Sequence, residues 1–207
     1  MCGTVDGATK GMITGAAFHW YSGDHFDPLE LVQQQYPSLK LIASESCNEY
    51  RFLDKNAVFD NAAKLAHELI GDLNHGVCAF YDWNLLLDEH GGPNHVRNWC
   101  HAAFLYDKKE KVLHPQLFRQ YYYHFARFIA PGAKRIGTSK YTDKLEVTAF
   151  RNPNETIAVV MFNKGKEPIP VNLRLDGQLA ELVVKGKTIV TEIIQFEGGI
   201  VPCLLGH

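Results

Sequence analysis

The first half of the chain alternates short apolar runs with helical patterns. Apolar residues gather at 12–20, 39–43 and 76–83, and each run has the length of a buried strand. Between the second and third runs, apolar residues recur at a helical period and predict a helix over 57–73. Its apolar positions are Val58, Ala62, Leu65, Leu69 and Leu73. Strands that alternate with helices are typical of the units of a parallel α/β barrel.

Two further helices are predicted from their start signals and apolar faces. One starts with Asp27 as the N-cap and Pro28 at the first helical position, and it ends before the next proline. The other covers 115–129, and the three adjacent tyrosines 121–123 point in different directions, so at least one ring should contact a second domain. The segment 84–101 is predicted to be a long loop without regular structure, which is usually functional. The buried side of the later helix is expected to hold Phe118, Tyr122, Phe125 and Ile129.

The pattern changes after Pro131-Gly132. Beyond this break, apolar and polar residues alternate with a period of two, which predicts β-strands with one buried face. Short turns, among them Lys164-Gly165 and Lys185-Gly186, separate the strands. The predicted strands are 144–151, 156–163, 169–175, 179–184 and 187–196. Strands at this spacing indicate a β-sandwich, so we expect two domains, at 1–131 and 132–207.

Polar and aromatic residues follow each apolar run of the first half. The first run ends in His19-Trp20-Tyr21, the second in Glu45-Ser46-Cys47 and the third in Asp82-Trp83-Asn84. A glutamate in the middle of a buried strand would need a partner, whereas the carboxyl ends of barrel strands face a functional cleft. Aromatic rings stack on sugar rings, and Asn or Glu binds the hydroxyls, so these residues indicate a sugar site. A solvated loop position stays open for Glu45, and core positions stay open for Trp20 and Trp83.

Five blocks of the sequence carry a family resemblance. They are Phe18–Tyr21 (FHWY), Ala43–Cys47 (ASESC), Asp82–Leu87 (DWNLLL), Gly91–Asn98 (GGPNHVRN) and Tyr122–Gly137 (YYHFARFIAPGAKRIG). In these blocks the chain resembles glycoside hydrolase family 30, and within it the glucosylceramidases, from about Gly11 to its end. The resemblance implies an α/β part followed by an all-β part. These would be the last three βα units of a (β/α)8 TIM barrel and a C-terminal β-sandwich.

The resemblance also implies a reaction and roles for individual residues. It implies a retaining β-glycoside hydrolase that acts on a β-linked glucoside through a covalent glycosyl-enzyme, with a role in sphingolipid or carbohydrate metabolism. Glu45 matches the family's nucleophile, and Asn98 matches an active-site Asn. Cys47 matches a thiol at the rim of the site, although a small core residue is the alternative. The implied substrate-binding residues are His19, Trp20, Tyr21, Cys47, Asp82, Trp83 and Asn98.

The second carboxylate of a retaining enzyme has no match. In the family, the general acid/base lies in an Asn-Glu pair after an earlier barrel strand. This chain has Asn48-Glu49 in the nucleophile's own loop and Asn154-Glu155 in a turn of the sandwich, and neither fits. We therefore expect the acid/base and the first five barrel strands to be missing from this chain. A three-stranded remnant has two open edges, so we expect aggregation, domain swapping or a second polypeptide that completes the barrel. Because the acid/base is missing, we also expect poor hydrolysis by the chain alone.

Two other interpretations of function stay open. The chain could be a non-catalytic truncated remnant, or a carbohydrate-binding protein that uses its aromatic rim. It could also be a family relative that acts on β-1,6-glucan or xylan, because the loops that select the aglycone lie partly outside this chain. A mechanism-based inhibitor separates an enzyme from a binding protein, since only a competent nucleophile at position 45 is labelled.

Composition excludes several classes of function. The net charge of −2 and the pI of about 6.5 give no reason to expect nucleic acid or an anionic membrane as a partner. No apolar run approaches the roughly 20 residues that span a bilayer, and the first residues do not form a signal peptide. The five scattered cysteines favour free thiols in a reducing compartment, so we expect a cytoplasmic protein or a fragment of a secreted one. The ten histidines lack zinc-site spacing, and glycoside hydrolysis needs only carboxylates and water, so we expect no metal or cofactor.

Overall fold

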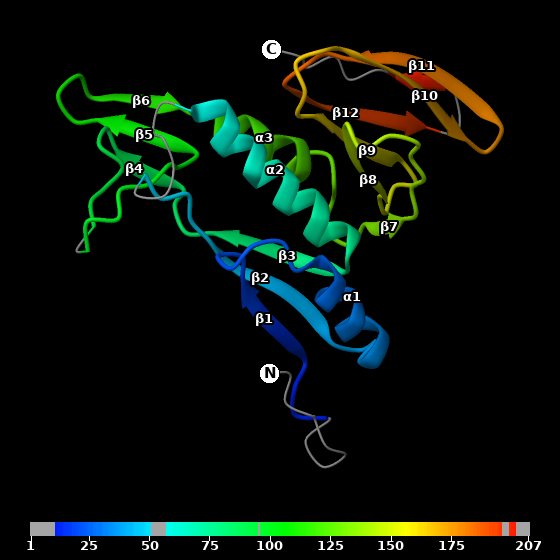
Figure 1. Ribbon diagram of the computed structural model, residues 1–207, viewed down its shortest axis with the longest axis horizontal. Coiled ribbons are helices and arrows are strands. Elements are labelled where there is room, and N and C mark those ends of the chain that lie inside the picture. The colour runs from blue at the N-terminus through cyan, green and yellow to red at the C-terminus, as the bar shows by residue number, and fades with distance from the viewer. Residues whose placement is uncertain (1–10, 51–56, 95, 196–198, 202–207) are drawn as a thin grey trace. The chain divides into compact units, whose positions relative to one another are not determined.

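The computed structural model describes residues 11–50, 57–94, 96–195 and 199–201 (Figure 1). The chain forms two compact units. The smaller unit holds 11–47 and 71–83, and the larger holds 48–70 and the chain from 84 onward. The segment 1–10, which we expected to be loose, lies outside the described residues, as do Cys2, His95 and Cys203.

The smaller unit is built on a parallel sheet of three strands in the order β1-β2-β3. This is the arrangement expected of consecutive barrel units, and it confirms all three predicted strands. The first strand begins at Gly15 rather than at Met12, because the neighbouring strand begins at Lys40, directly opposite Gly15. The strands are β1 (Gly15–His19), β2 (Lys40–Ser46) and β3 (Val77–Asp82).

Helix α1 (Phe26–Gln35) connects β1 to β2 and begins earlier than predicted. His25 occupies the N-cap position and Asp27 lies in the first turn, so the prediction of Asp27 as the N-cap is wrong. The Phe26 ring stacks on the His75 imidazole with 5.2 Å between centroids, and it lies against Gly71, where any Cβ would overlap it. This packing favours Phe26 as the first helical residue, while the Asp27 carboxylate still faces the positive end of the helix.

The core of the smaller unit lies between α1 and one face of the sheet. Its buried members are Leu29, Leu41, Ala43 and Val77. Leu41 and Ala43 are alternate residues of β2, as expected for a strand with one face on a helix. The burial of each large aliphatic side chain stabilises the unit by about 1.5–3 kcal/mol. Partly buried residues that pack around them are Phe18, Phe26, Val32 and Phe80.

Helix α2 (Val58–Asn74) confirms the predicted helix to within one residue at each end. Its buried apolar residues follow the predicted period and include Ala62, Leu65, Ala66, Leu69 and Ile70. The buried face also carries Asn61, Glu68 and Asp72, which are polar. Residues 61, 65, 68 and 72 recur on one side of the helix, so these polar groups share a stripe with apolar neighbours. The apolar period alone does not predict them.

The larger unit contains a five-stranded antiparallel sheet, in the order β13-β12-β9-β8-β7, and a separate β10-β11 hairpin. The five predicted strands correspond to β8 to β12, and the β-sandwich is confirmed. The strands β7 and β13 have three residues each, which is too short for a period-two pattern to show. The strands are β7 (Lys134–Ile136), β8 (Leu145–Arg151), β9 (Ile157–Asn163), β10 (Ile169–Leu175), β11 (Gln178–Val184), β12 (Thr188–Gln195) and β13 (Gly199–Val201).

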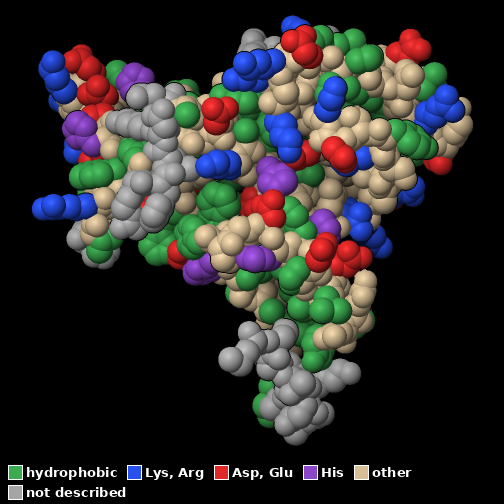
Figure 2. Space-filling view, in the orientation of Figure 1, with side chains coloured by type: hydrophobic (Ala, Val, Ile, Leu, Met, Phe, Trp, Pro, Cys, Tyr) green, Lys and Arg blue, Asp and Glu red, His purple; other side chains and the backbone are tan. Residues whose placement is uncertain are grey.

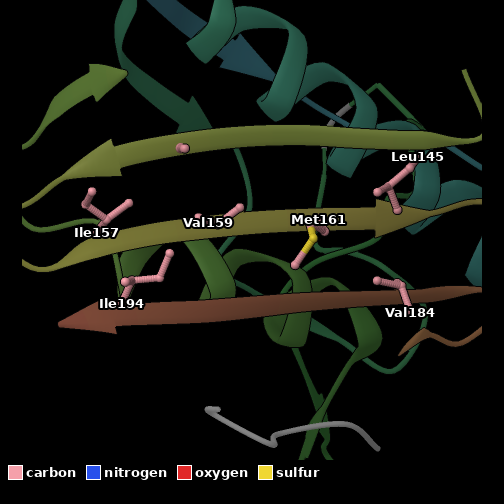
Figure 3. Packing of buried hydrophobic residues seen from close by; sticks show 7 residues of the cluster. Leu145, Ile157, Val159, Met161, Val184 and Ile194 are labelled. Carbon is pink, nitrogen blue, oxygen red and sulfur yellow. The ribbon is translucent and has the colours of Figure 1, made fainter. Parts of the chain in front are cut away.

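The sandwich core lies between the hairpin and one face of the larger sheet. Figure 3 shows its residues on neighbouring strands, with β9 in the centre. Ile157, Val159 and Met161 alternate along β9 and point to this side, which is the period-two pattern read from the sequence. The whole of β9 is buried, because its other face is covered as well. The remaining fully buried members are Leu145, Ala149, Val184 and Ile194.

Helix α3 (Leu117–Ala126) packs on the opposite face of the same sheet. The Tyr121 ring lies edge-on to Phe162 of β9, with 5.8 Å between centroids, which confirms that one of the three tyrosines contacts the sandwich. The prediction of Tyr122 on the buried side is wrong, because Tyr121 fits the same helical face and meets this aromatic partner. The buried residues of the helix are Phe118, Tyr121, His124 and Phe125.

The segment 84–101 is not entirely irregular. It contains β4, which pairs with β5, and Cys100 forms an isolated bridge with Glu49. The Asp88 carboxylate holds the turn that follows β4, because its Oδ1 accepts hydrogen bonds from the amides of His90 and Gly92. Pro115 ends a strand and does not start a helix, so the start predicted for α3 is also wrong. The strands are β4 (Leu86–Asp88), β5 (Phe104–Asp107) and β6 (Val112–Pro115), in that order in the sheet.

Candidate active site

A bulge at the carboxyl end of β2 determines where Glu45 lies. Along the β1-β2 ladder Phe18 pairs with Ala43, but the next residue of β1, His19, pairs with Glu45. Ser44 is therefore the extra residue, and its hydroxyl donates a hydrogen bond to the carbonyl oxygen of Phe18 at 3.3 Å. A bulge of this kind re-aims the side chain that follows it and often lies beside an active site.

The Glu45 carboxylate has two neighbours from the end of β1. The Tyr21 hydroxyl donates a hydrogen bond to Glu45 Oε1 at 3.0 Å, and His19 Nδ1 lies 3.7 Å from the same oxygen. The His19 and Tyr21 rings meet edge to face, with 5.9 Å between centroids. The Glu45 side chain is 25% exposed, so it is neither buried in the core nor fully solvated. The three residues form an accessible carboxylate held by a hydroxyl donor.

The end of β3 lies next to the end of β2. Asp82 pairs with Ser46, and the Trp83 amide donates to the carbonyl oxygen of Ser46 at 2.9 Å. The Trp83 side chain is 67% exposed, so it is not a core residue. Asp82 is half-buried beside it. The chain therefore presents a free indole face one strand away from the glutamate.

Trp20 and Cys47 differ from Trp83 in their burial. Trp20 is half-buried, its ring lies 6.0 Å from that of Tyr21, and its indole Nε1 is buried without a hydrogen-bond partner. Cys47 is buried and forms no disulfide, and its burial favours the alternative that it is a small core residue. Asn98 belongs to the larger unit, where it is half-buried and its carbonyl oxygen accepts a hydrogen bond from Cys100 Sγ at 2.9 Å.

The smaller unit thus brings together Glu45, His19 and Tyr21 directly, and places Asp82 and Trp83 on the adjacent strand end. The sequence did not predict the role of Ser44. A hydroxyl between an apolar run and a carboxylate is a weak signal, because the bulge depends on the register with a second strand.

In the described part of the chain, no group of three or more His, Cys, Asp or Glu residues could hold a metal ion. Each helix in this part is too short or too polar to cross a bilayer.

Two domain families match consecutive parts of the chain. The glycosyl hydrolase family 30 TIM-barrel domain matches residues 4–129, and the glycosyl hydrolase family 30 beta sandwich domain matches residues 132–192. These are the two architectures that the strands and helices show. The match extends over both compact units.

Curated relatives agree with this family. The lysosomal acid glucosylceramidase of Mus musculus is 30% identical over 170 residues, which cover 78% of this chain and 33% of the mouse protein. The putative glucosylceramidase 4 of Caenorhabditis elegans is 30% identical over 161 residues, which cover 74% of this chain and 31% of that protein. The matched region therefore spans about a third of the length of these relatives.

Solved structures share the fold. SrfJ from Salmonella typhimurium has a TM-score of 0.88 and 32% identity, with 93% of this chain and 43% of SrfJ covered. The endo-beta1,6-glucanase BT3312 has a TM-score of 0.76 and 26% identity, with 89% of this chain and 41% of that enzyme covered. With matches to both of its domain types and relatives of this similarity, the chain belongs to glycosyl hydrolase family 30.

Proposed function

We propose that this chain carries the nucleophile of a retaining β-glycosidase of the glucosylceramidase type. The observation that supports this most strongly is the Glu45 carboxylate, which ends a parallel strand, is partly exposed and accepts a hydrogen bond from Tyr21. A retaining enzyme needs a carboxylate that is ionised, reachable by the sugar and held in one orientation. The relatives named as glucosylceramidases support a β-glucoside as the substrate.

The geometry suggests how Glu45 would act. Its Oε1 is engaged by Tyr21, which leaves Oε2 to attack the anomeric carbon as the bond to the leaving oxygen breaks. The hydrogen bond from Tyr21 restricts the orientation of the carboxylate. Water then attacks the same carbon and releases the carboxylate. The exposed ring of Trp83 would stack on the sugar, and Asp82 and Asn98 are proposed hydroxyl ligands.

The acid/base carboxylate is proposed to come from outside these 207 residues. Glu155 is exposed in the turn between β8 and β9, where it pairs with Arg151 at 3.4 Å. Glu49 is half-buried, and its backbone forms an isolated bridge with Cys100. Neither glutamate directly follows a strand of the parallel sheet, as the proton donor of a barrel enzyme would, so we propose that the proton donor is supplied by another segment of barrel. We also propose a domain boundary at 131/132, which the break between the two family matches supports.

The open edges of the small sheet lead to a prediction about association. Among the described residues, β1 and β3 pair only with β2. We expect the isolated chain to self-associate, since unpaired edges invite further strands. An Ala17→Lys variant, which places a charge on the exposed edge strand β1, should shift light-scattering mass toward the monomer. A Val183→Lys variant, which changes an exposed residue of β11, is the matched control and should leave the mass unchanged. A monodisperse wild-type monomer with one cooperative unfolding transition would contradict this prediction.

Covalent labelling tests the proposed nucleophile without the acid/base. A 2-fluoro-glucoside with a dinitrophenolate leaving group needs no protonation to react, and its fluorine slows release of the intermediate. We expect intact-mass spectrometry to show one fluoroglucosyl group per chain, and peptide mapping to place it on Glu45. The Glu45→Gln variant should not be labelled, because an amide is too weak a nucleophile.

The control is a neighbouring carboxylate. An Asp82→Asn variant keeps Glu45 and should still be labelled, although more slowly if Asp82 binds a sugar hydroxyl. Circular dichroism should show that each variant is folded. A folded wild-type chain that gains no label, or a label on another residue, would show that Glu45 is not a competent nucleophile.

A non-catalytic carbohydrate-binding protein is the second candidate. The exposure of Trp83 (67%) and Tyr21 (51%) favours it, because both rings are available to a sugar whether or not the carboxylate reacts. Such a protein would bind β-glucosides without being labelled. Because the chain is similar to an endo-beta1,6-glucanase, a β-1,6-glucan should be tested for binding as well as β-glucosides.

A further inference from the structure

A groove in the larger unit lies far from Glu45 in the sequence and has no part in the proposed reaction. It runs between α3 and the start of β12 and has a volume of about 320 Å³. Ligand pockets range from about 300 to 1,000 Å³, so this groove admits a small ligand. Its lining residues are Leu117, Arg119, Gln120, Tyr121, Tyr123, His124, Lys187, Thr188 and Ile189.

Two cations line the groove, and aromatic rings support both of them. The Arg119 guanidinium lies 5.6 Å from the centre of the Phe104 ring, and the Lys187 ammonium lies 4.7 Å from the centre of the Phe59 ring. Contact with a ring face holds a cation in place but leaves N–H groups free to donate elsewhere. Neither cation has a carboxylate partner among the described residues. No Asp or Glu lines the groove.

The remaining polar groups of the groove add hydrogen bonding but no charge. His124 shares a hydrogen bond through Nδ1 with Thr191 at 2.9 Å, and its burial lowers its pKa to about 4, so it is neutral at pH 7. The Gln120 and Tyr123 side chains are exposed and can donate. The lining therefore carries two positive charges at neutral pH, with no negative charge to compensate them.

A repeated Lys-Gly-Lys sequence adds positive charge at the same end of the sandwich. The turn Lys164-Gly165-Lys166 lies beside the turn Lys185-Gly186-Lys187, and the Lys187 amide donates to the Gly165 carbonyl oxygen at 2.7 Å. A Cβ at Gly186 would overlap the backbone of Lys166, so only glycine allows the two turns to come this close. Lys164 is paired with Glu146 at 2.8 Å, whereas Lys166 and Lys185 are exposed. Figure 2 shows Lys and Arg side chains on the surface of the sandwich, with Asp and Glu side chains among them.

We propose that this groove binds the phosphate group of a phosphate monoester. A phosphate monoester carries between one and two negative charges near pH 7 and three acceptor oxygens, which match two cations and nearby neutral donors. The planar guanidinium of Arg119 can contact two phosphate oxygens at once, and Lys187 supplies a point charge from the other wall. The phosphate could belong to a soluble sugar phosphate or to a lipid headgroup, because the groove recognises only the charged group.

Titration calorimetry on the 207-residue chain tests this proposal. Glucose 6-phosphate and vesicles that contain phosphatidylinositol 4-phosphate represent the two sources, and glucose, potassium sulfate and potassium chloride at equal ionic strength are the controls. We expect binding of at least one phosphate ligand and none of glucose or chloride. The Arg119→Gln and Lys187→Asn variants should each weaken that binding about tenfold, as for the loss of one charge-assisted hydrogen bond. Asn tolerates the left-handed backbone of Lys187, whose φ is 54°, so this variant should fold.

The matched control is Arg174→Gln, which removes an exposed arginine of β10 that does not line the groove. It should leave the affinity for phosphate unchanged. If this control lost as much affinity for phosphate as the groove variants, only the overall charge of the chain would matter, and the proposal would fail. The proposal would also fail if sulfate bound as tightly as the phosphate ligands, if no phosphate ligand bound, or if the groove variants bound like the wild type.

Discussion

An Asp72→Asn variant should become more stable relative to the wild type as the pH rises from 4 to 8. Asp72 is 1% exposed on α2, and neither oxygen of its carboxyl group has a hydrogen-bond partner. Burial raises its pKa from 3.8 to about 7, because the charged form loses its hydration. The carboxyl group is therefore neutral in the folded chain at pH values where it is ionised in the unfolded chain.

The sign of the effect follows from this difference. With a raised folded pKa, the contribution of Asp72 is fully present below pH 3.8 and is lost as the pH rises to about 7. A shift of about three pKa units corresponds to about 4 kcal/mol at pH 8. Asparagine mimics the neutral acid at every pH, so the stability difference between variant and wild type should grow by about this amount.

The measurement is the unfolding free energy in urea at pH 4 and pH 8, at one protein concentration because association would shift the transition. The control is Asp176→Asn, which changes an exposed residue in the turn between β10 and β11 and should give a constant difference from the wild type. Parallel pH curves for Asp72→Asn and the wild type would contradict this prediction, because they would show that the pKa of Asp72 is the same in the folded and unfolded chains.

The buried histidine on α3 explains why variants must be compared with the wild type at each pH. Burial lowers the pKa of His124 to about 4, so the folded chain resists protonation that the unfolded chain accepts below pH 6.5. Stability from this residue is lost as the pH falls from 6.5 to 4, which is opposite to the trend from Asp72. In the wild type the two trends partly cancel. In Asp72→Asn the loss of stability toward low pH should no longer be offset by Asp72.

The fold was largely predictable where the apolar pattern was long. The helix α2 and the strands β8 to β12 follow strong periods of 3.6 and 2, and the structure confirms them. Strands of three residues, such as β4 and β7, are set by their partners and leave no pattern of their own. The sequence also did not determine whether Tyr121 or Tyr122 is buried. Both fit a helical face, and only the position of Phe162 decides between them.

The sequence indicated which strand ends meet at the candidate site, but not the geometry there. The end of an apolar run marked Glu45, and the end of the run before it marked His19 and Tyr21, because parallel strands end at one edge. The bulge at Ser44 could not be predicted, since it is a mismatch between two strands rather than a property of one. The burial of Cys47 and the exposure of Trp83 depend in the same way on which elements cover each strand end.

A Phe162→Ala variant should lose about 3–5 kcal/mol of unfolding free energy, which is the usual range for an aromatic residue removed from a core. Phe162 is fully buried on β9. Its ring lies 5.8 Å from that of Tyr121 on α3 and 6.5 Å from that of Phe59 on α2, so it links both helices to the sandwich. Total stabilities of about 5–15 kcal/mol are usual, so this loss would remove a large part of the stability.

The role of Phe162 in linking the helices to the sandwich can be separated from its burial by a matched pair of variants. Met161 is equally buried but points into the sandwich core, away from the helices, and Met161→Leu conserves volume, as Phe162→Leu nearly does. We expect Met161→Leu to retain the near-ultraviolet circular dichroism of the tyrosines, and Phe162→Leu to change it because Tyr121 loses its ring partner. A double-mutant cycle of Phe162→Leu with Tyr121→Leu should give a coupling of about 0.5–1.5 kcal/mol. A coupling near zero would mean that the helices are held to the sheet by other contacts, such as the bond between His124 and Thr191.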